Sequence, residues 1–91
     1  MSAEGQAVAL EALLVDELQI PDRFGPHIRC VVAPDRGALL ASISIKAGGD
    51  RYWVQEYVET DGCLDRAPFL AEAYRRAFGR REALRELLGW F

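Results

Sequence analysis

Three side chains of this sequence could ligate a soft metal ion or act on a substrate: His27, Cys30 and Cys63. The His27-x-x-Cys30 spacing suggests zinc, but strand residues three apart point to opposite faces, and a structural zinc ion takes four ligands. A cysteine nucleophile with His27 as base and Asp61 as orienting group is the corresponding catalytic arrangement, and nothing in the sequence assembles it. We therefore predict no metal site, no cofactor and no catalytic set.

The other short motifs indicate structure rather than chemistry. Ala47-Gly48-Gly49-Asp50 lies between two predicted strands instead of before a helix, so we interpret it as a hairpin turn and not as a phosphate-binding loop. Cys30 is predicted to be a small core residue, whereas Cys63 falls in a predicted loop, where we expect exposure. Two cysteines do not make a disulfide scaffold, which favours a reducing compartment.

Length and composition favour one compact domain over residues 1–91. The chain has 91 residues, of which 51% are hydrophobic, and a chain of this size buries somewhat over ~60% of its unfolded surface. No apolar run reaches the ~20 residues that span a bilayer, and the N-terminus lacks the basic start of a signal peptide. We predict a cytoplasmic domain without membrane contact.

The charges are distributed unevenly along the chain. Residues 1–22 contain five acidic side chains and no basic one, while residues 66–91 contain six arginines and three glutamates. The net charge of −3 argues against non-specific nucleic-acid binding, which needs phosphates neutralised by Lys and Arg. A candidate basic patch is formed by Arg75, Arg76, Arg80, Arg81 and Arg85. We favour the competing interpretation, an exposed helix face paired with Glu72, Glu82 and Glu86.

The first third of the chain predicts a helix and a loop. Residues 3–20 form the helix, which Ser2 can cap and Pro21 ends. Its apolar stripe consists of Ala7, Leu10, Leu14 and Leu18, widened by Leu13 and Val15. In the loop of residues 21–26, Phe24 is expected at the edge of the core.

Three strands follow, over His27–Ala33, Ala38–Lys46 and Arg51–Glu59. The turn between the first two can close with Gly37 in the left-handed conformation. Short turns make the strands an antiparallel meander with the second strand in the middle. On that strand one face is Leu39, Ala41, Ile43 and Ile45, and the other, less buried face is Leu40, Ser42, Ser44 and Lys46.

The C-terminal quarter predicts two short helices. Residues 69–78 have an amphipathic pattern with an apolar face of Phe69, Leu70, Ala73, Tyr74, Ala77 and Phe78. A straight helix through Gly79 would bring arginines into this apolar arc, so we predict a break there and a last helix over residues 80–90; one bent helix is the alternative. The fold class is α+β: a three-stranded antiparallel meander with one N-terminal helix and two short C-terminal helices, in the order α-β-β-β-α-α.

This order resembles the double-stranded-RNA-binding domain, and Gly25-Pro26-His27 is similar to the loop before that family's first strand. The family has a lysine cluster at the start of its second helix, where this sequence has Ala67-Pro68-Phe69-Leu70. Without those lysines most phosphate contacts are missing, so we do not assign the chain to the family.

The third strand carries apolar side chains on both faces, and neither face is plainly the one exposed to water. If Tyr52, Val54 and Val58 join the core, Trp53 and Tyr57 lie on the other face near Leu40, Ser42 and Ser44. Either helices cover both faces of the sheet, or the second face is an interface, for which homodimerisation is the simplest form.

From this surface we predict a small protein–protein interaction module: an adaptor, inhibitor, assembly factor or accessory subunit. The expected partner-binding residues are Trp53, Tyr57, Arg29 and Leu40. The alternative is a nucleic-acid-binding domain that uses the C-terminal arginine cluster.

Overall fold

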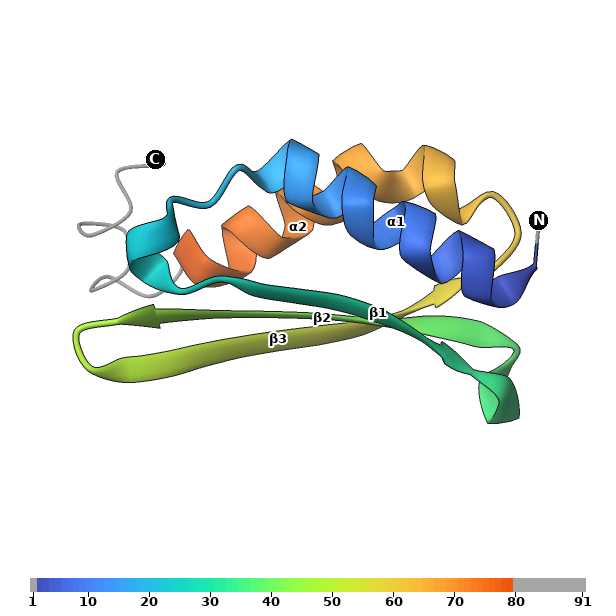
Figure 1. Cartoon of the computed structure of the whole chain (residues 1–91), viewed down its shortest axis with the longest axis horizontal. Coiled ribbons are helices and arrows are strands. Elements are labelled where there is room, and N and C mark those ends of the chain that lie inside the picture. The colour runs from blue at the N-terminus through green and yellow to red at the C-terminus, as the bar shows by residue number, and fades with distance from the viewer. Residues whose placement is uncertain (1, 80–91) are drawn as a thin grey trace.

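The computed structural model describes residues 2–79, whose two α-helices lie on the same face of a three-stranded sheet (Figure 1). The helices are α1 (Ala3–Leu18) and α2 (Ala67–Gly79), and the strands are β1 (His27–Ala33), β2 (Ala38–Ala47) and β3 (Asp50–Glu59). Three short 3-10 turns connect them: η1 (Asp22–Phe24), η2 (Pro34–Arg36) and η3 (Cys63–Arg66). The predicted α+β class and element order are confirmed. The predicted break after Gly79 and the predicted helix over residues 80–90 lie outside the described residues.

Helix α1 begins as the sequence predicts and ends two residues earlier. The Ser2 hydroxyl accepts the Gly5 N–H at 3.1 Å, which caps the first turn. Gln19 adopts a left-handed conformation with φ 47°, and its N–H donates to the Val15 carbonyl, so the helix stops at Leu18. The chain has therefore already left the helix before it reaches Pro21.

The predicted stripe of α1 is buried, but it is narrower than expected. Ala7, Leu10, Leu14 and Leu18 pack in the core. The predicted widening by Leu13 and Val15 is wrong: these side chains are 39% and 52% exposed. A helix that rests on one side of a single sheet buries one stripe, and residues beside the stripe remain in water.

The sheet has the order β1-β2-β3 with both pairs antiparallel, as predicted for a meander. Gly37, after η2, has φ 58° and donates its N–H to the Pro34 carbonyl, which closes the first turn in the predicted way. The β2 residues that face the helices are fully buried: Leu39, Ala41, Ile43 and Ile45. The central strand thus supplies the floor of the core.

Helix α2 covers the other half of this floor, and its buried face matches the prediction in part: Tyr74 and Phe78 are buried as predicted, and Leu70 packs against the core. Its fully packed positions follow a four-three-four spacing and are Ala67, Ala71, Tyr74 and Phe78. Phe69 lies outside this stripe and is 77% exposed, so its predicted place in the core is wrong. The Tyr74 hydroxyl donates to the Ala41 carbonyl at 3.3 Å, which satisfies the one polar atom that this side chain buries.

The turn η3 overturns a further expectation about burial. Cys63 is only 1% exposed, because η3 packs against both α1 and α2 and closes the end of the core between them. Phe24, by contrast, is buried beside the sheet as expected. Within residues 2–79 we find no helix with the length and apolar character needed to cross a membrane.

Candidate functional site

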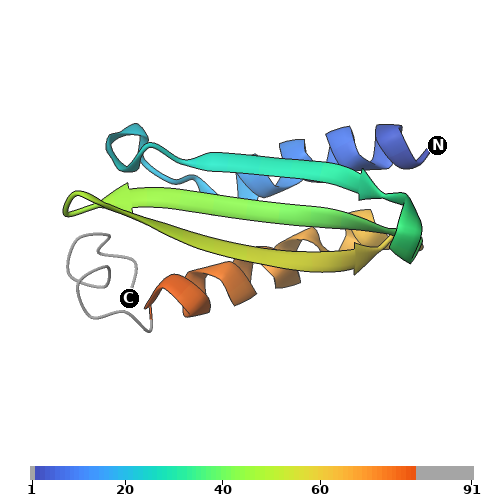
Figure 2. The ribbon, with the colours of Figure 1, turned by 90° about the horizontal axis from the view of Figure 1, so that it is seen from below.

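The face of the sheet opposite the helices is the candidate site, and we call it the open face. It consists of the odd-numbered residues 27–33 of β1, the even-numbered residues 38–46 of β2 and the odd-numbered residues 51–59 of β3. Figure 2 shows the three strands in front from this side, with α1 and α2 behind them. Within residues 2–79, no helix covers this face.

Cross-strand pairing arranges the open face in rows. Trp53 lies opposite Ser44, which lies opposite His27. The second row lies two residues further along each strand and consists of Gln55, Ser42 and Arg29. The third row consists of Tyr57, Leu40 and Val31. Each row lies two residues, or about 6.7 Å, from the next.

The two aromatic side chains stand out from this surface. Trp53 is 55% exposed and Tyr57 is 52% exposed, although both belong to residue types that are mostly buried. Val31, at the other end of the row that contains Tyr57, is also exposed. Leu40 lies between these two residues and is half-buried. The strand phase that places Tyr52, Val54 and Val58 toward the helices is therefore the one adopted.

Two arginines, Arg36 and Arg51, contact other groups at this surface. The Arg36 guanidinium of η2 lies 4.3 Å from the centre of the Tyr57 ring, a cation–π contact. The Nη1 atom of Arg51 donates to the Ser44 hydroxyl at 2.8 Å and to the Gly25 carbonyl at 3.4 Å. Ser44 is 1% exposed, so side chains of the open face shield it even though no described helix does.

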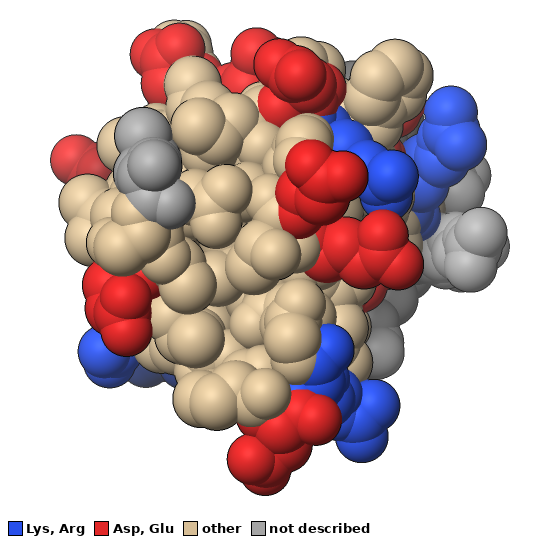
Figure 3. All heavy atoms as spheres, turned by 90° about the vertical axis from the view of Figure 1, so that its right-hand side faces the viewer, with Lys and Arg blue, Asp and Glu red and all other residues tan. Residues whose placement is uncertain are grey.

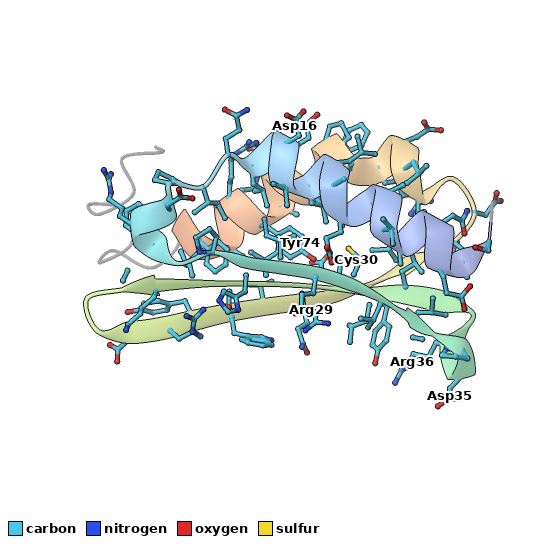
Figure 4. All side chains as sticks on the ribbon, viewed as in Figure 1. Asp16, Arg29, Cys30, Asp35, Arg36 and Tyr74 are labelled. Carbon is cyan, nitrogen blue, oxygen red and sulfur yellow. The ribbon has the colours of Figure 1, made fainter. Side chains whose placement is uncertain are left out.

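The four predicted partner-binding residues all belong to the open face. Arg29, in the middle row, is exposed and lies on the side of the sheet away from the helices, as does Arg36 (Figure 4). Sequence reasoning did not select Arg36 or Arg51. The signal for Arg36 was its position in the turn before Gly37, which returns the chain over the sheet.

The open face is cationic although the whole chain is acidic. It carries Arg29, Lys46 and Arg51, joined by Arg36 from η2, against two acids, Glu59 and Asp35, of which Asp35 precedes Arg36 in the same turn and lies on the same side of the sheet (Figure 4). Helix α1, on the other side of the sheet, has the opposite character, with four acids and no base. The two sides of the sheet therefore present opposite charge to a partner.

The predicted basic patch is described only in part. Arg75 and Arg76 lie on α2 and pair with Glu72 at 3.5 Å and 3.7 Å. The Nη2 atom of Arg75 also donates to the Glu17 carbonyl, which ties α2 to α1. Arg80, Arg81 and Arg85 lie outside the described residues. The two described arginines thus have local partners within the helical layer.

The residues considered for metal or thiol chemistry lie in different places. His27 belongs to the open face, whereas Cys30 faces the helices and Cys63 lies in η3. Burial, the Glu11 carboxylate and Cys63 raise the pKa of the Cys30 thiol to about 12, the opposite of what an activated nucleophile needs. Among the described residues, no group of three or more His, Cys, Asp or Glu could hold a metal ion.

Two hollows lie on the side of the sheet that the helices cover. One, of about 340 Å³, lies between the end of α1 and the start of β1 and has Val15, Ile20 and Ile28 in its wall. The other, of about 400 Å³, is bordered by Arg66, Phe69 and Leu70. Figure 3 shows the end of the molecule where both helices begin, with uncharged side chains at its centre and charged ones around the margin. The second hollow combines one exposed aromatic, Phe69, with Arg66, whereas the open face has two exposed aromatic residues and four cations.

The sequence matches no protein-family model and no curated protein. The function of the open face must therefore be inferred from its own chemistry.

Proposed function

We propose that this chain is a protein–protein interaction module that binds its partner through the open face. The observation that carries the proposal is the exposure of Trp53 and Tyr57 on one surface that no helix of residues 2–79 covers, with Arg36 stacked on the Tyr57 ring. Aromatic residues and arginine are the types enriched at protein interfaces and at the hot spots within them. Their number on a small sheet is more than an ordinary solvent-facing strand requires.

A peptide-display selection tests the proposal. A library of random peptides is selected on the full chain, and the affinity of the recovered peptides is then measured on the Trp53→Ala/Tyr57→Ala double variant. We expect the recovered peptides to bind the wild type and to lose at least about ten-fold in affinity on the double variant. Peptides that bind both proteins equally, or a selection that yields none, would overturn the proposal.

Nucleic-acid binding is the competing function and has its own test. Titration with an oligonucleotide at about 50 mM and about 500 mM salt distinguishes it, because phosphate contacts weaken steeply as salt rises. We expect no salt-sensitive binding. Tight, salt-sensitive binding would replace the proposed function.

A further inference from the structure

The spacing of groups on the open face carries an inference about its partner, which rests on the function proposed above. Along the strands the rows alternate in character. By position along the strands, the pair Lys46–Arg51 comes first, and the Arg51 guanidinium reaches Ser44 in the neighbouring Trp53 row. The Arg29 row follows, and then the Tyr57 row with Arg36 stacked upon it. The period of this alternation is two residues per row, or about 6.7 Å.

An extended polypeptide has the same period. Its side chains point to one side at every second residue, so a strand laid along the open face presents a side chain to each row in turn. Carboxylates suit the cationic rows, because guanidinium groups bind them with two parallel hydrogen bonds. Apolar side chains suit the aromatic rows.

We propose that the open face binds an extended acidic segment of another protein, in which a carboxylate and an apolar side chain alternate at every second residue. The pattern is acid-x-apolar-x-acid-x-apolar. Four cations against two acids, Glu59 and Asp35, make the face complementary to such a segment, whereas the acids of α1 lie on the other side of the sheet. Electrostatic complementarity of this kind selects partners and speeds their association.

The same charge disfavours two other occupants. A second copy packed face to face would bring the arginine rows of both copies together. Residues 80–91 of the chain itself carry three arginines against two glutamates, so they match the cationic face poorly. A nucleic acid is also anionic, so oligo-dT serves in the test below as the competing probe. An acidic polypeptide is the occupant that the surface favours.

Binding of a labelled peptide, Glu-Thr-Leu-Thr-Glu-Thr-Leu-Thr-Glu, tests the inference by fluorescence anisotropy. Three probes are compared with it. The first is a peptide of the same composition in which the glutamates follow one another in a single block, the second is the same peptide with Lys in place of each Glu, and the third is oligo-dT. We expect the alternating peptide to bind about five-fold tighter than the block peptide and at least about ten-fold tighter than the lysine peptide. Equal binding of the block or lysine peptide would overturn the inference, as would tighter binding of oligo-dT.

Matched variants locate the contact. Arg29→Gln should weaken the alternating peptide roughly three- to ten-fold, while Arg66→Gln, which removes an exposed arginine on the helical side, should leave it unchanged. Equal effects of the two variants would mean that net charge alone is sensed and would overturn the inference. Circular dichroism of both variants checks that each is folded.

The remaining occupants are tested on the full chain by the exposure of Trp53, first without peptide and then with it. Trp90→Phe makes Trp53 the only tryptophan, and we expect acrylamide to quench it readily in the free protein and less after peptide is added. A Trp53 already shielded in a monomer would assign the face to the chain's own residues, and a concentration-dependent dimer would assign it to a second copy; either result overturns the inference. If the display selection yields Trp53-dependent peptides without acids, the proposed function stands and only this inference falls.

Discussion

The Glu11 carboxylate accepts the backbone N–H of Cys30 at 2.9 Å and so ties α1 to the outer edge of β1. An edge strand exposes unpaired N–H groups that invite another chain, and a side-chain acceptor blocks one of them. This contact leaves the β1 edge less available than the open face for partner binding.

Replacing Glu11 should therefore lower the free energy of unfolding. We expect Glu11→Ala to lose about 1–3 kcal/mol in urea denaturation, because the partly buried N–H of Cys30 loses its acceptor. Glu11→Gln keeps an oxygen at the same place and should lose less. Asp16→Ala is the control, since Asp16 is an exposed acid of the same helix that points away from the sheet (Figure 4). Equal losses for Glu11→Ala and Asp16→Ala would contradict the structural role of this contact.

Tyr74 offers a second test of the core. Removing only its hydroxyl in Tyr74→Phe breaks the bond to the Ala41 carbonyl and should lower the free energy of unfolding by about 1 kcal/mol. Tyr74→Ala also empties a fully buried site and should lose about 3–5 kcal/mol. Phe69→Ala removes an exposed aromatic from the same helix and should change stability by less than about 0.5 kcal/mol. A larger loss at Phe69 than at Tyr74 would mean that the α2 stripe is wrongly placed.

Stability should fall in alkaline solution, and Cys30 supplies part of the fall. The folded protein raises the pKa of this thiol from 9.0 to about 12, chiefly by burial, then through Glu11 and Cys63. Above pH 9 the unfolded chain loses this proton while the folded chain keeps it, so the folded state loses about 1.4 kcal/mol per pH unit until about pH 12. Below pH 9 the thiol contributes no pH dependence.

Comparison with Cys30→Ala isolates this contribution. Burial also raises the pKa of Tyr74, which is present in both proteins and adds to the fall above its ordinary pKa. Urea denaturation at several pH values between 8 and 10.5 should give a steeper decline for the wild type than for Cys30→Ala. Parallel declines would show that the Cys30 thiol ionises as freely in the folded protein as in the unfolded chain.

Trp53→Ala distinguishes a contact residue from a core residue. Because more than half of the side chain is exposed, we expect a loss of about 1 kcal/mol or less, compared with about 2–5 kcal/mol for Leu39→Ala on the neighbouring strand. Thermal melting and sedimentation measure stability and mass together. A loss as large as that of Leu39→Ala, in a protein of unchanged mass, would place Trp53 in the core and remove it from the partner surface.

Much of the fold follows from local patterns in the sequence. The alternation along residues 38–46 predicts which face of β2 is buried, since a strand that is covered on one side must keep its apolar residues in phase. Pro34 and Gly37 predict the turn that reverses the chain, because their backbone preferences match it. Ser2 predicts the start of α1 through its side-chain acceptor. These features depend on residues close together in the chain.

What the sequence left open depended on contacts between distant segments. Both faces of β3 carry apolar side chains, so only its pairing with β2 decided that Val58 is buried and that Trp53 and Tyr57 are exposed. Periodicity placed Phe69 and Val15 on apolar stripes, yet each described helix buries only the stripe that meets the sheet and the other helix. Cys63 lies in a loop by sequence and in the core by structure, because η3 folds against both helices. The sequence alone determined the strands and turns of this protein, while the tertiary structure decided which side of the sheet the described helices cover and which aromatic residues remain for a partner.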